Sequence, residues 1–207
     1  MREAPSIKAV VFDYGGVIEL SSATTSLFSD IADAIGVPVD TFRSEYYKLN
    51  HLSNVGNMPQ EELLPRVASL MGIDNAKNII LSVMDAHRLQ KTVNTELVDL
   101  LSMIRQKGFK VAIFSNNTSK LRDRLKENGI LKLVDEVVIS GEIGFQKPHK
   151  DAFDFLFKVL GVLSHEVVFI DDSPKSIEGA GEIGYIPILF KNNEQLMAEL
   201  QNIGISL

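Results

Sequence analysis

Five short runs of apolar residues constrain most strongly what this chain can fold into. They are Ala9–Phe12, Val111–Phe114, Glu136–Ile139, Val167–Ile170 and Ile186–Phe190. Their apolar residues, rich in β-branched types, are nearly continuous instead of alternating with polar ones. That pattern is typical of strands buried on both faces of a parallel sheet. The sequence therefore predicts a parallel sheet of five strands.

Helical patterns lie between the later runs. Glu96–Gln106 carries an apolar stripe at helical spacing, made of Leu97, Leu100, Leu101 and Ile104. Further helices are predicted at Ser119–Asn128, Asp151–Leu160, Pro174–Ile183 and Glu194–Ile203. The first three of these are each followed by a glycine, a common helix stop. Strands and helices that alternate with short links predict a doubly wound α/β fold.

One stretch breaks this alternation, because the residues between the first two runs are mainly helical in pattern. Helices are predicted at Thr25–Ile35, Asp40–Leu49, Gln60–Met71 and Asn75–Leu89. The expected organisation is a core of residues 1–20 and 91–207, with an all-helical insert, residues 21–90, after the first strand. The insert is expected to form a mobile lid whose hinges are Glu19–Ser22 and Gln90–Asn94.

Composition and charge exclude several classes of function. The chain has 207 residues, no cysteine and a net charge of −6, from 27 acidic residues against 21 Lys and Arg. This acidic balance makes nucleic acid an unexpected partner, and the absence of cysteine removes disulfides, thiolate metal sites and thiol catalysis. No apolar run approaches the roughly 18 residues of a membrane helix, and the first residues lack a signal-peptide core. A cytoplasmic protein without membrane contact is expected.

Polar residues suited to chemistry follow the predicted strands. Asp13 follows the first strand, Ser115 the second, Lys147 lies beyond the third, and Asp171 and Asp172 follow the fourth. Ligands of an open α/β sheet bind beyond the carboxyl ends of its strands. Each residue type alone is common at turns and helix caps. Together, and in this order, they predict a site for a phosphoryl group held with a divalent cation.

The motifs around these residues resemble those of the haloacid dehalogenase (HAD) superfamily of phosphoryl-transfer enzymes with a helical cap of the first type. VVFDYGGV, IFSNN, GFQKP and VFIDDSP match in order and span residues 10 to 174. The nearest branch resembles the N-terminal phosphatases of epoxide hydrolases and the sugar-phosphate phosphatases. The resemblance implies a HAD-like Rossmannoid core and a phosphatase acting on a small phosphorylated metabolite.

The resemblance also implies catalytic roles for individual residues. Asp13 would be the nucleophile that forms an aspartyl-phosphate, which splits one difficult step into two. Ser115 and the backbone N–H of Asn116 would bind the phosphoryl oxygens. Lys147 would lie between Asp13 and the phosphate and offset the repulsion between the two anions.

The resemblance further implies Mg²⁺, a cation that prefers hard oxygen ligands. Its ligands would be Asp13, the carbonyl oxygen of Gly15, and Asp171 or Asp172. Which member of the adjacent pair binds the cation directly, and which acts through water, stays open in the sequence.

The sequence departs from the family pattern at Gly15. Most phosphatases of this family have a second Asp there, which protonates the leaving oxygen and then deprotonates the attacking water. Three explanations stay open. The substrate has a good leaving group, such as an anomeric, acyl or aryl phosphate; another residue, Glu19, His51 or His87, replaces the acid; or the protein binds phosphorylated compounds without turning them over.

Two alternatives to a phosphatase follow from these residues. A 2-haloacid dehalogenase would use the same Asp13 without a metal, but Asp171 and Asp172 have no evident use in that reaction. A metabolite-binding or partner-binding protein with the same fold would bind Mg²⁺ and phosphate without turnover. Tyr46 and Tyr47 in the insert could face a substrate, but they are interpreted as core or surface residues of the helical bundle.

Overall fold

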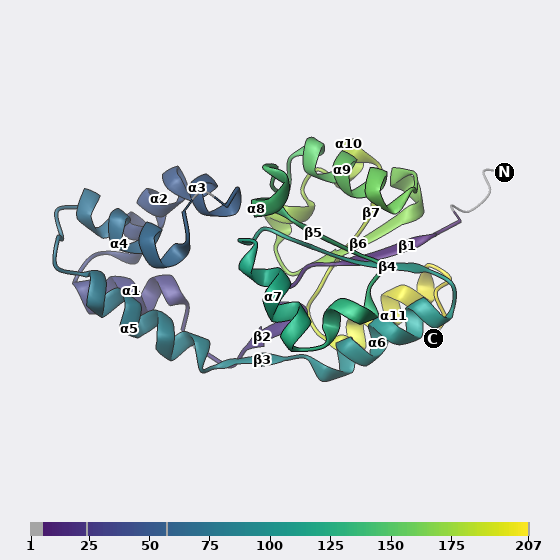
Figure 1. Cartoon of the computed structure of the whole chain (residues 1–207), viewed down its shortest axis with the longest axis horizontal. Helices are drawn as coiled ribbons and strands as arrows, with labels where there is room; N and C mark the ends of the chain where they lie inside the picture. The colour runs from purple at the N-terminus through teal and green to yellow at the C-terminus, as the bar shows by residue number, and fades with distance from the viewer. Residues whose placement is uncertain (1–5, 24, 57, 207) are drawn as a thin grey trace.

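The centre of the molecule is a parallel sheet with the strand order β5-β4-β1-β6-β7 (Figure 1). A computed structural model describes residues 6–23, 25–56 and 58–206. The strands are β1 (Ala9–Phe12), β4 (Lys110–Ser115), β5 (Glu136–Ile139), β6 (Val167–Asp171) and β7 (Ile186–Leu189). All five predicted strands and the α/β fold class are confirmed.

Strand β1 lies in the middle of the sheet, with β4 and β6 as its two neighbours. Ala9 is in register with Lys110 on one side and with Val167 on the other. The chain continues from β1 through β4 and β5, then returns to the other side of β1 with β6 and β7. Such a reversal of strand order opens a crevice at the carboxyl ends of the central strands.

Helices cover both faces of the sheet because alternate residues of each strand point to opposite faces. Val10 and Phe12 of β1 pack with one buried cluster, and Ala9 and Val11 with the other. The first cluster includes residues of α6 (Thr95–Gln106), α7 (Lys120–Glu127) and α11 (Asn193–Asn202). The second includes residues of α9 (Lys150–Leu160), on the opposite side of the sheet (Figure 1).

Between β1 and β4 the chain forms a separate helical bundle, which we call the cap. Its helices are α1 (Leu27–Ile35), α2 (Val39–Leu49), α3 (His51–Asn54), α4 (Gln60–Leu70) and α5 (Lys77–Arg88). Four of them correspond to predicted helices, and the short α3 was not predicted. The cap has its own apolar core, which contains Ile31, Phe42, Leu63, Leu64 and Ile80.

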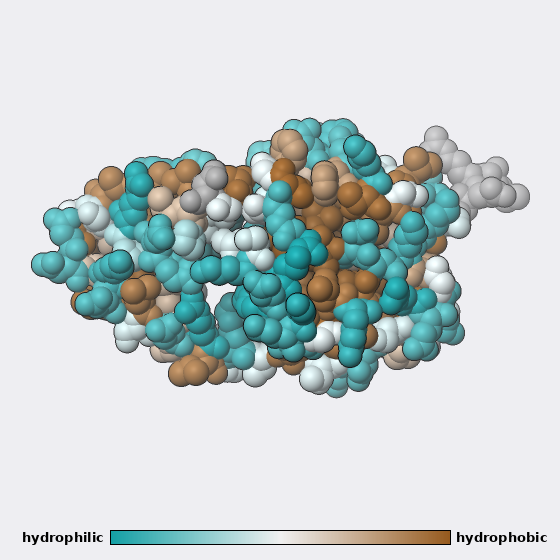
Figure 2. All heavy atoms as spheres, in the orientation of Figure 1, coloured by the Kyte–Doolittle hydropathy of each residue, from teal (hydrophilic) through white to brown (hydrophobic). Residues whose placement is uncertain are grey.

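A two-stranded antiparallel ribbon joins the cap to the core. It consists of β2 (Glu19–Ser21) and β3 (Lys91–Val93), in the segments expected to be hinges. Both chain crossings between the two parts therefore pass through one hydrogen-bonded element. Next to the ribbon, an opening bordered by hydrophilic side chains lies between the cap and the core (Figure 2).

The prediction of one helix over Pro174–Ile183 was wrong. The segment forms a 3₁₀ turn, η3 (Pro174–Ile177), and a short helix, α10 (Ala180–Ile183). Gly179, between the two pieces, interrupts the pattern, because glycine loses more backbone entropy in a helix than any other residue. A second short helix, α8 (Ser140–Ile143), was not predicted. Within the described residues, every helix falls short of the length and apolar content that crossing a membrane requires.

Candidate active site

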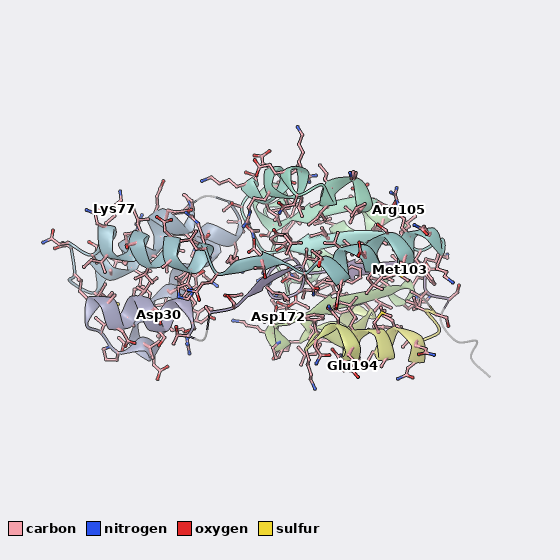
Figure 3. The ribbon with its side chains drawn as sticks, turned by 90° about the horizontal axis from the view of Figure 1, so that it is seen from below. Asp30, Lys77, Met103, Arg105, Asp172 and Glu194 are labelled. Carbon is pink, nitrogen blue, oxygen red and sulfur yellow. The ribbon has the colours of Figure 1, made fainter. Side chains whose placement is uncertain are left out.

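Three carboxylates meet at the carboxyl ends of β1 and β6. Asp13 directly follows β1, Asp171 is the last residue of β6, and Asp172 comes next. One oxygen of each lies within 4.8 Å of the others. Asp13 and Asp171 are 8% and 1% exposed, and Asp172 lies on the side of the core that faces the cap (Figure 3). The sheet topology thus brings two distant sequence motifs into one acidic cluster.

Lys147 supplies the positive charge of this cluster. Its Nζ atom lies 2.9 Å from Asp13 Oδ1 and 2.6 Å from Asp171 Oδ2. The lysine is 4% exposed, and its ammonium group lies 5.4 Å and 5.0 Å from the ring centroids of Phe114 and Phe169. A buried cation between two carboxylates is held in place by charge and by the aromatic walls.

The side chain of Asn116 fixes the backbone of Lys147. Asn116 Nδ2 donates to the Lys147 carbonyl oxygen at 3.0 Å, and the Lys147 N–H donates to Asn116 Oδ1 at 2.8 Å. Sequence reasoning assigned Asn116 only a backbone contact with phosphate and missed this pairing. The available signal was an amide side chain directly after a strand end. Asn116 is thus a positioning residue for Lys147, in addition to any phosphate contact.

Electrostatic repulsion within the cluster shifts the pKa values of its groups. Asp172 is exposed at the surface, but partial desolvation of its carboxyl group, together with the charges of Asp13 and Asp171, raises its pKa to about 6. Burial and the charge of Asp13 raise the pKa of Asp171, against the lowering effect of Lys147. For Lys147, burial lowers the pKa, but Asp13 and Asp171 outweigh it and raise the value above the usual range. The lysine is therefore protonated at neutral pH.

The cluster fits a divalent cation. Three carboxylates and one ammonium leave two negative charges uncompensated. Asp13 Oδ1 is buried and accepts no hydrogen bond from the described residues, although Lys147 Nζ lies 2.9 Å away. Mg²⁺ takes oxygen ligands in an octahedral shell at about 2.0–2.1 Å. Asp13, Asp171 and Asp172 have the chemistry and the proximity for such a site.

The other two predicted site residues lie at the same edge of the sheet. Ser115 ends β4 and is 3% exposed. Gly15 lies in the turn after β1 and pairs with Glu19 through an isolated β-bridge. A Cβ atom at Gly15 would meet nothing within 4 Å. There is therefore open space beside Gly15, and steric crowding is not the reason for a glycine at this position.

Glu19, one of the suggested replacements for the missing acid, is held by the linker ribbon. Its carboxylate accepts from Lys91 Nζ at 2.6 Å, from Arg124 Nη1 at 3.3 Å and from the Tyr14 hydroxyl at 3.2 Å. In the described structure, no hydrogen bond or ion pair joins Glu19 to Asp13. Glu19 thus ties the ribbon to the core, and its carboxylate contacts Lys91 and Arg124 instead of the acidic cluster.

The two histidines suggested for the same role belong to the cap. His51 is exposed at the start of α3. His87 is 8% exposed, and its Nε2 atom lies 2.7 Å from Asp30 Oδ2. Asp30 also accepts from the Thr25 hydroxyl at 2.7 Å. Neither histidine has a hydrogen bond to the acidic cluster among the described residues, so the structure brings neither of them to Asp13.

The cap contacts the core close to the acidic cluster. The Lys175 ammonium, in the turn that follows Asp172, lies 5.3 Å from the ring centroid of Tyr47. Tyr47 is 51% exposed, whereas Tyr46 is buried in the cap. Tyr46 thus belongs to the core of the cap and Tyr47 to its surface, as interpreted from the sequence, and Tyr47 also contacts the core domain through Lys175.

The amino-acid sequence matches the haloacid dehalogenase-like hydrolase family over residues 7–184. That match covers most of the chain, so the protein belongs to the HAD-like hydrolases. Bifunctional epoxide hydrolase 2 of Sus scrofa is 23% identical over 223 residues, which cover 98% of this chain and 40% of that protein. The glyceraldehyde 3-phosphate phosphatase of Methanopyrus kandleri is 28% identical over 211 residues, which cover 95% of this chain and 89% of the phosphatase. The chain spans about two fifths of the length of the mammalian epoxide hydrolases that it matches.

Solved structures have the same fold. A HAD family enzyme from Bacteroides thetaiotaomicron superposes with a TM-score of 0.71 at 18% identity, over 94% of this chain and 98% of that one. A structure of that enzyme in complex with magnesium and inorganic phosphate gives a TM-score of 0.64 over 92% and 98% of the two chains, at 19% identity. The predicted family, fold and enzyme class are confirmed at the level of a HAD-like hydrolase.

Proposed function

We propose that this protein is a Mg²⁺-dependent phosphatase that hydrolyses a small phosphorylated metabolite. The observation that carries the proposal is the placement of Lys147 between Asp13 and Asp171, with Asp172 in the same cluster. Support comes from a relative named as a phosphatase and from a structural neighbour that holds magnesium and phosphate.

Asp13 is the nucleophile in this proposal. A carboxylate oxygen of Asp13 forms a bond to phosphorus while the bond to the leaving oxygen breaks, and the leaving oxygen keeps the electron pair. Water then attacks the phosphorus of the aspartyl-phosphate, which releases inorganic phosphate and restores the Asp13 carboxylate. The leaving oxygen takes up a proton from the solvent, and the attacking water keeps one proton on the released phosphate and returns the other to the solvent.

The surrounding residues position and neutralise the phosphoryl group. Lys147 offsets the repulsion between Asp13 and the incoming anion, and Asn116 holds Lys147 in place. Ser115 and the backbone N–H of Asn116 donate hydrogen bonds to phosphoryl oxygens. Asp13, the Gly15 carbonyl oxygen, Asp171 and Asp172 would hold Mg²⁺, which would supply positive charge near the phosphoryl group.

The glycine at position 15 restricts the substrates that this proposal allows. No side chain at Gly15 protonates the leaving oxygen, and Glu19 is occupied by Lys91 and Arg124. A positioned acid contributes about 10²–10⁴-fold to such reactions. The rate falls least without a positioned acid when the leaving oxygen is already a weak base, as in an anomeric, acyl or aryl phosphate. We therefore infer a preference for such phosphates.

The second candidate function is binding of phosphorylated compounds without turnover. The glycine at position 15 favours it, because the cluster keeps its charges and lacks only the acid. Dehalogenation of 2-haloacids is less suitable, because Asp171 and Asp172 add negative charge that the uncharged carbon–halogen bond does not need.

Release of inorganic phosphate from a panel of aryl, acyl, sugar-1-, sugar-6- and nucleoside phosphates tests the proposal. The panel is run with Mg²⁺, with a chelator, and with Asp13→Asn as the control. Metal-dependent release that disappears in Asp13→Asn is the expected result. If no substrate releases phosphate while Mg²⁺ still binds, the phosphatase proposal is wrong and the binding-protein alternative takes its place. A separate assay supplies a 2-haloacid in the presence of chelator, and release of halide there would identify a dehalogenase.

A further inference from the structure

A cavity of about 490 Å³ lies between the cap and the core. The core side includes Asn116, Asn117 and Thr118, and the cap side includes residues of α1, α3, α4 and α5. Asn116 also holds the backbone of Lys147, so this one residue connects the cavity with the candidate phosphoryl site. Clefts of this size between two folded parts are common ligand sites.

Basic side chains dominate the lining of this cavity. Arg88 and Lys91 approach from the cap and the ribbon, and Lys120 and Arg124 from α7. Glu61 is the one carboxylate among the described lining residues. The whole chain has the opposite balance, with a net charge of −6. A cleft with low-dielectric walls concentrates such a local excess of positive charge.

Nearby carboxylates compensate three of the four cations. Arg88 pairs with Glu61 and, at 2.9 Å, with Asp85. Lys91 and Arg124 share the carboxylate of Glu19.

Lys120 differs from these three cations, because it makes no ion pair with any residue that the structure describes. Its charge contributes to lowering the pKa of Glu61, which places the lysine near the cap across the cleft.

The position of Lys120 in its helix is unfavourable by itself. Lys120 is the first residue of α7, where the helix dipole favours anions and disfavours cations. Thr118, just before the helix, also lines the cavity. The dipole and the lysine therefore add their positive potentials at one wall. An anion bound in the cavity would offset both.

We propose that the cavity binds a second anionic group of the substrate. This inference rests on the proposed function and narrows its substrate class to phosphomonoesters that carry another acidic group, such as a carboxylate, on the leaving-group side. Lys120 is the specificity-determining residue, with Arg124 and the α7 N-terminus beside it.

Binding of nonhydrolysable phosphonates tests this proposal without any need for turnover. Phosphonopropionate, phosphonobutyrate and phosphonohexanoate are each compared with the alkylphosphonate of the same chain length, by calorimetry with Mg²⁺. The proteins are the wild type, Lys120→Gln and the control Lys126→Gln. Lys126 is exposed on the same helix and does not line the cavity.

In the wild type, at least one carboxylated probe is expected to bind about tenfold more tightly than its alkyl partner. Lys120→Gln is expected to bring that ratio close to one, and Lys126→Gln to leave it unchanged. A wild-type ratio near one, or a ratio unaffected by Lys120→Gln, would overturn the inference and leave the phosphate site standing. Equal weakening of both probes would assign Lys120 to cap closure instead. Failure of every phosphonate to bind would remove the proposed function and this inference together.

Discussion

The backbone of Gly16 lies directly against the carboxylate of Asp172. A Cβ atom on Gly16 would stand 2.1 Å from Asp172 Oδ2, a distance that no real side chain tolerates. The φ angle of Gly16 is 76°, in the left-handed region that glycine adopts most easily. The turn after β1 and the loop after β6 therefore pack together with no side chain between them. This packing limits where Asp172 can stand in the acidic cluster.

Gly16→Ala is expected to weaken Mg²⁺ binding by at least about tenfold, because Asp172 must move away from the added methyl group. Calorimetric titration with Mg²⁺ measures the effect. Gly36→Ala is the matched control: its φ angle is 73°, and a Cβ there would meet nothing within 4 Å. Both variants should lose roughly 1–2 kcal/mol of folding stability, because alanine disfavours the left-handed conformation. Only Gly16→Ala should lose metal affinity. Unchanged affinity in Gly16→Ala would contradict the role given to this contact.

Gly15→Asp is expected to raise the turnover of an alkyl phosphate by about 10²-fold or more, because it restores a general acid. The open space at Gly15 makes room for the side chain. An aryl phosphate, whose leaving oxygen needs less protonation, should gain less. Gly15→Asn has nearly the same shape without the acid and should gain nothing. Steady-state rates for both substrates measure the difference, and a loss or no change in Gly15→Asp would count against a missing acid.

A second glycine contact joins the cap to the core. A Cβ atom on Gly56, in the cap loop after α3, would lie 2.6 Å from the carbonyl oxygen of Gly141 in α8. Gly56→Ala is therefore expected to hold the cap away from the core and lower kcat/KM by about tenfold, because the closed cap excludes water from the reaction.

Gly72→Ala provides the control for this variant. Gly72 also lies in the cap, with a φ angle of 84° against 83° for Gly56, and a Cβ there would meet nothing within 4 Å. The two alanine variants should lose similar thermal stability, and only Gly56→Ala should lose activity. Equal kcat/KM in both variants would show that the contact between Gly56 and Gly141 has no part in turnover.

Mg²⁺ binding is expected to weaken as the pH falls through about 6. Desolvation and the charges of Asp13 and Asp171 together raise the pKa of Asp172 to about 6. The cation binds the ionised carboxylate and therefore competes with the proton. Affinity should be level above about pH 7 and fall about tenfold per pH unit below about pH 6.

Calorimetry across this pH range, in two buffers of different ionisation enthalpy, also counts the protons that Mg²⁺ releases. Near pH 6, about one-half of a proton or more should be released for each Mg²⁺ ion that binds. A carboxyl with the ordinary value of 3.8 would release almost none there. Affinity that stays level down to about pH 5 would contradict the raised pKa.

The strands and most helices were predictable because their signals are local. Four consecutive apolar residues predict β1 as a buried strand, and the leucine stripe predicts α6 as a helix. Neither prediction depends on the rest of the chain. The prediction of one helix over Pro174–Ile183 was wrong, because a helical pattern at each end of the segment hid the effect of Gly179 between them. The ribbon of β2 and β3 was invisible for a different reason: each strand is stabilised only by a partner far away in the sequence.

The candidate site was predictable in part. Asp13 and Asp171 each end an apolar run, and the rule that strand ends share one edge of the sheet places them together. Lys147 has no such local signal, since its loop is placed by Asn116. The ion pairs of Glu19 with Lys91 and Arg124 were likewise not predictable, because the three residues lie far apart in the sequence.

The sequence by itself determined the sheet, the helical insert after the first strand and the residue types at the strand ends, since these depend on hydrophobic periodicity within short segments. Tertiary structure alone decided how the segments meet. It placed Lys147 between two carboxylates, pressed Gly16 onto Asp172 and left Lys120 without an ion-pair partner among the described residues at the wall of the cavity. The physical reason is that these features depend on distances between side chains of separate elements, which packing sets and no local pattern records.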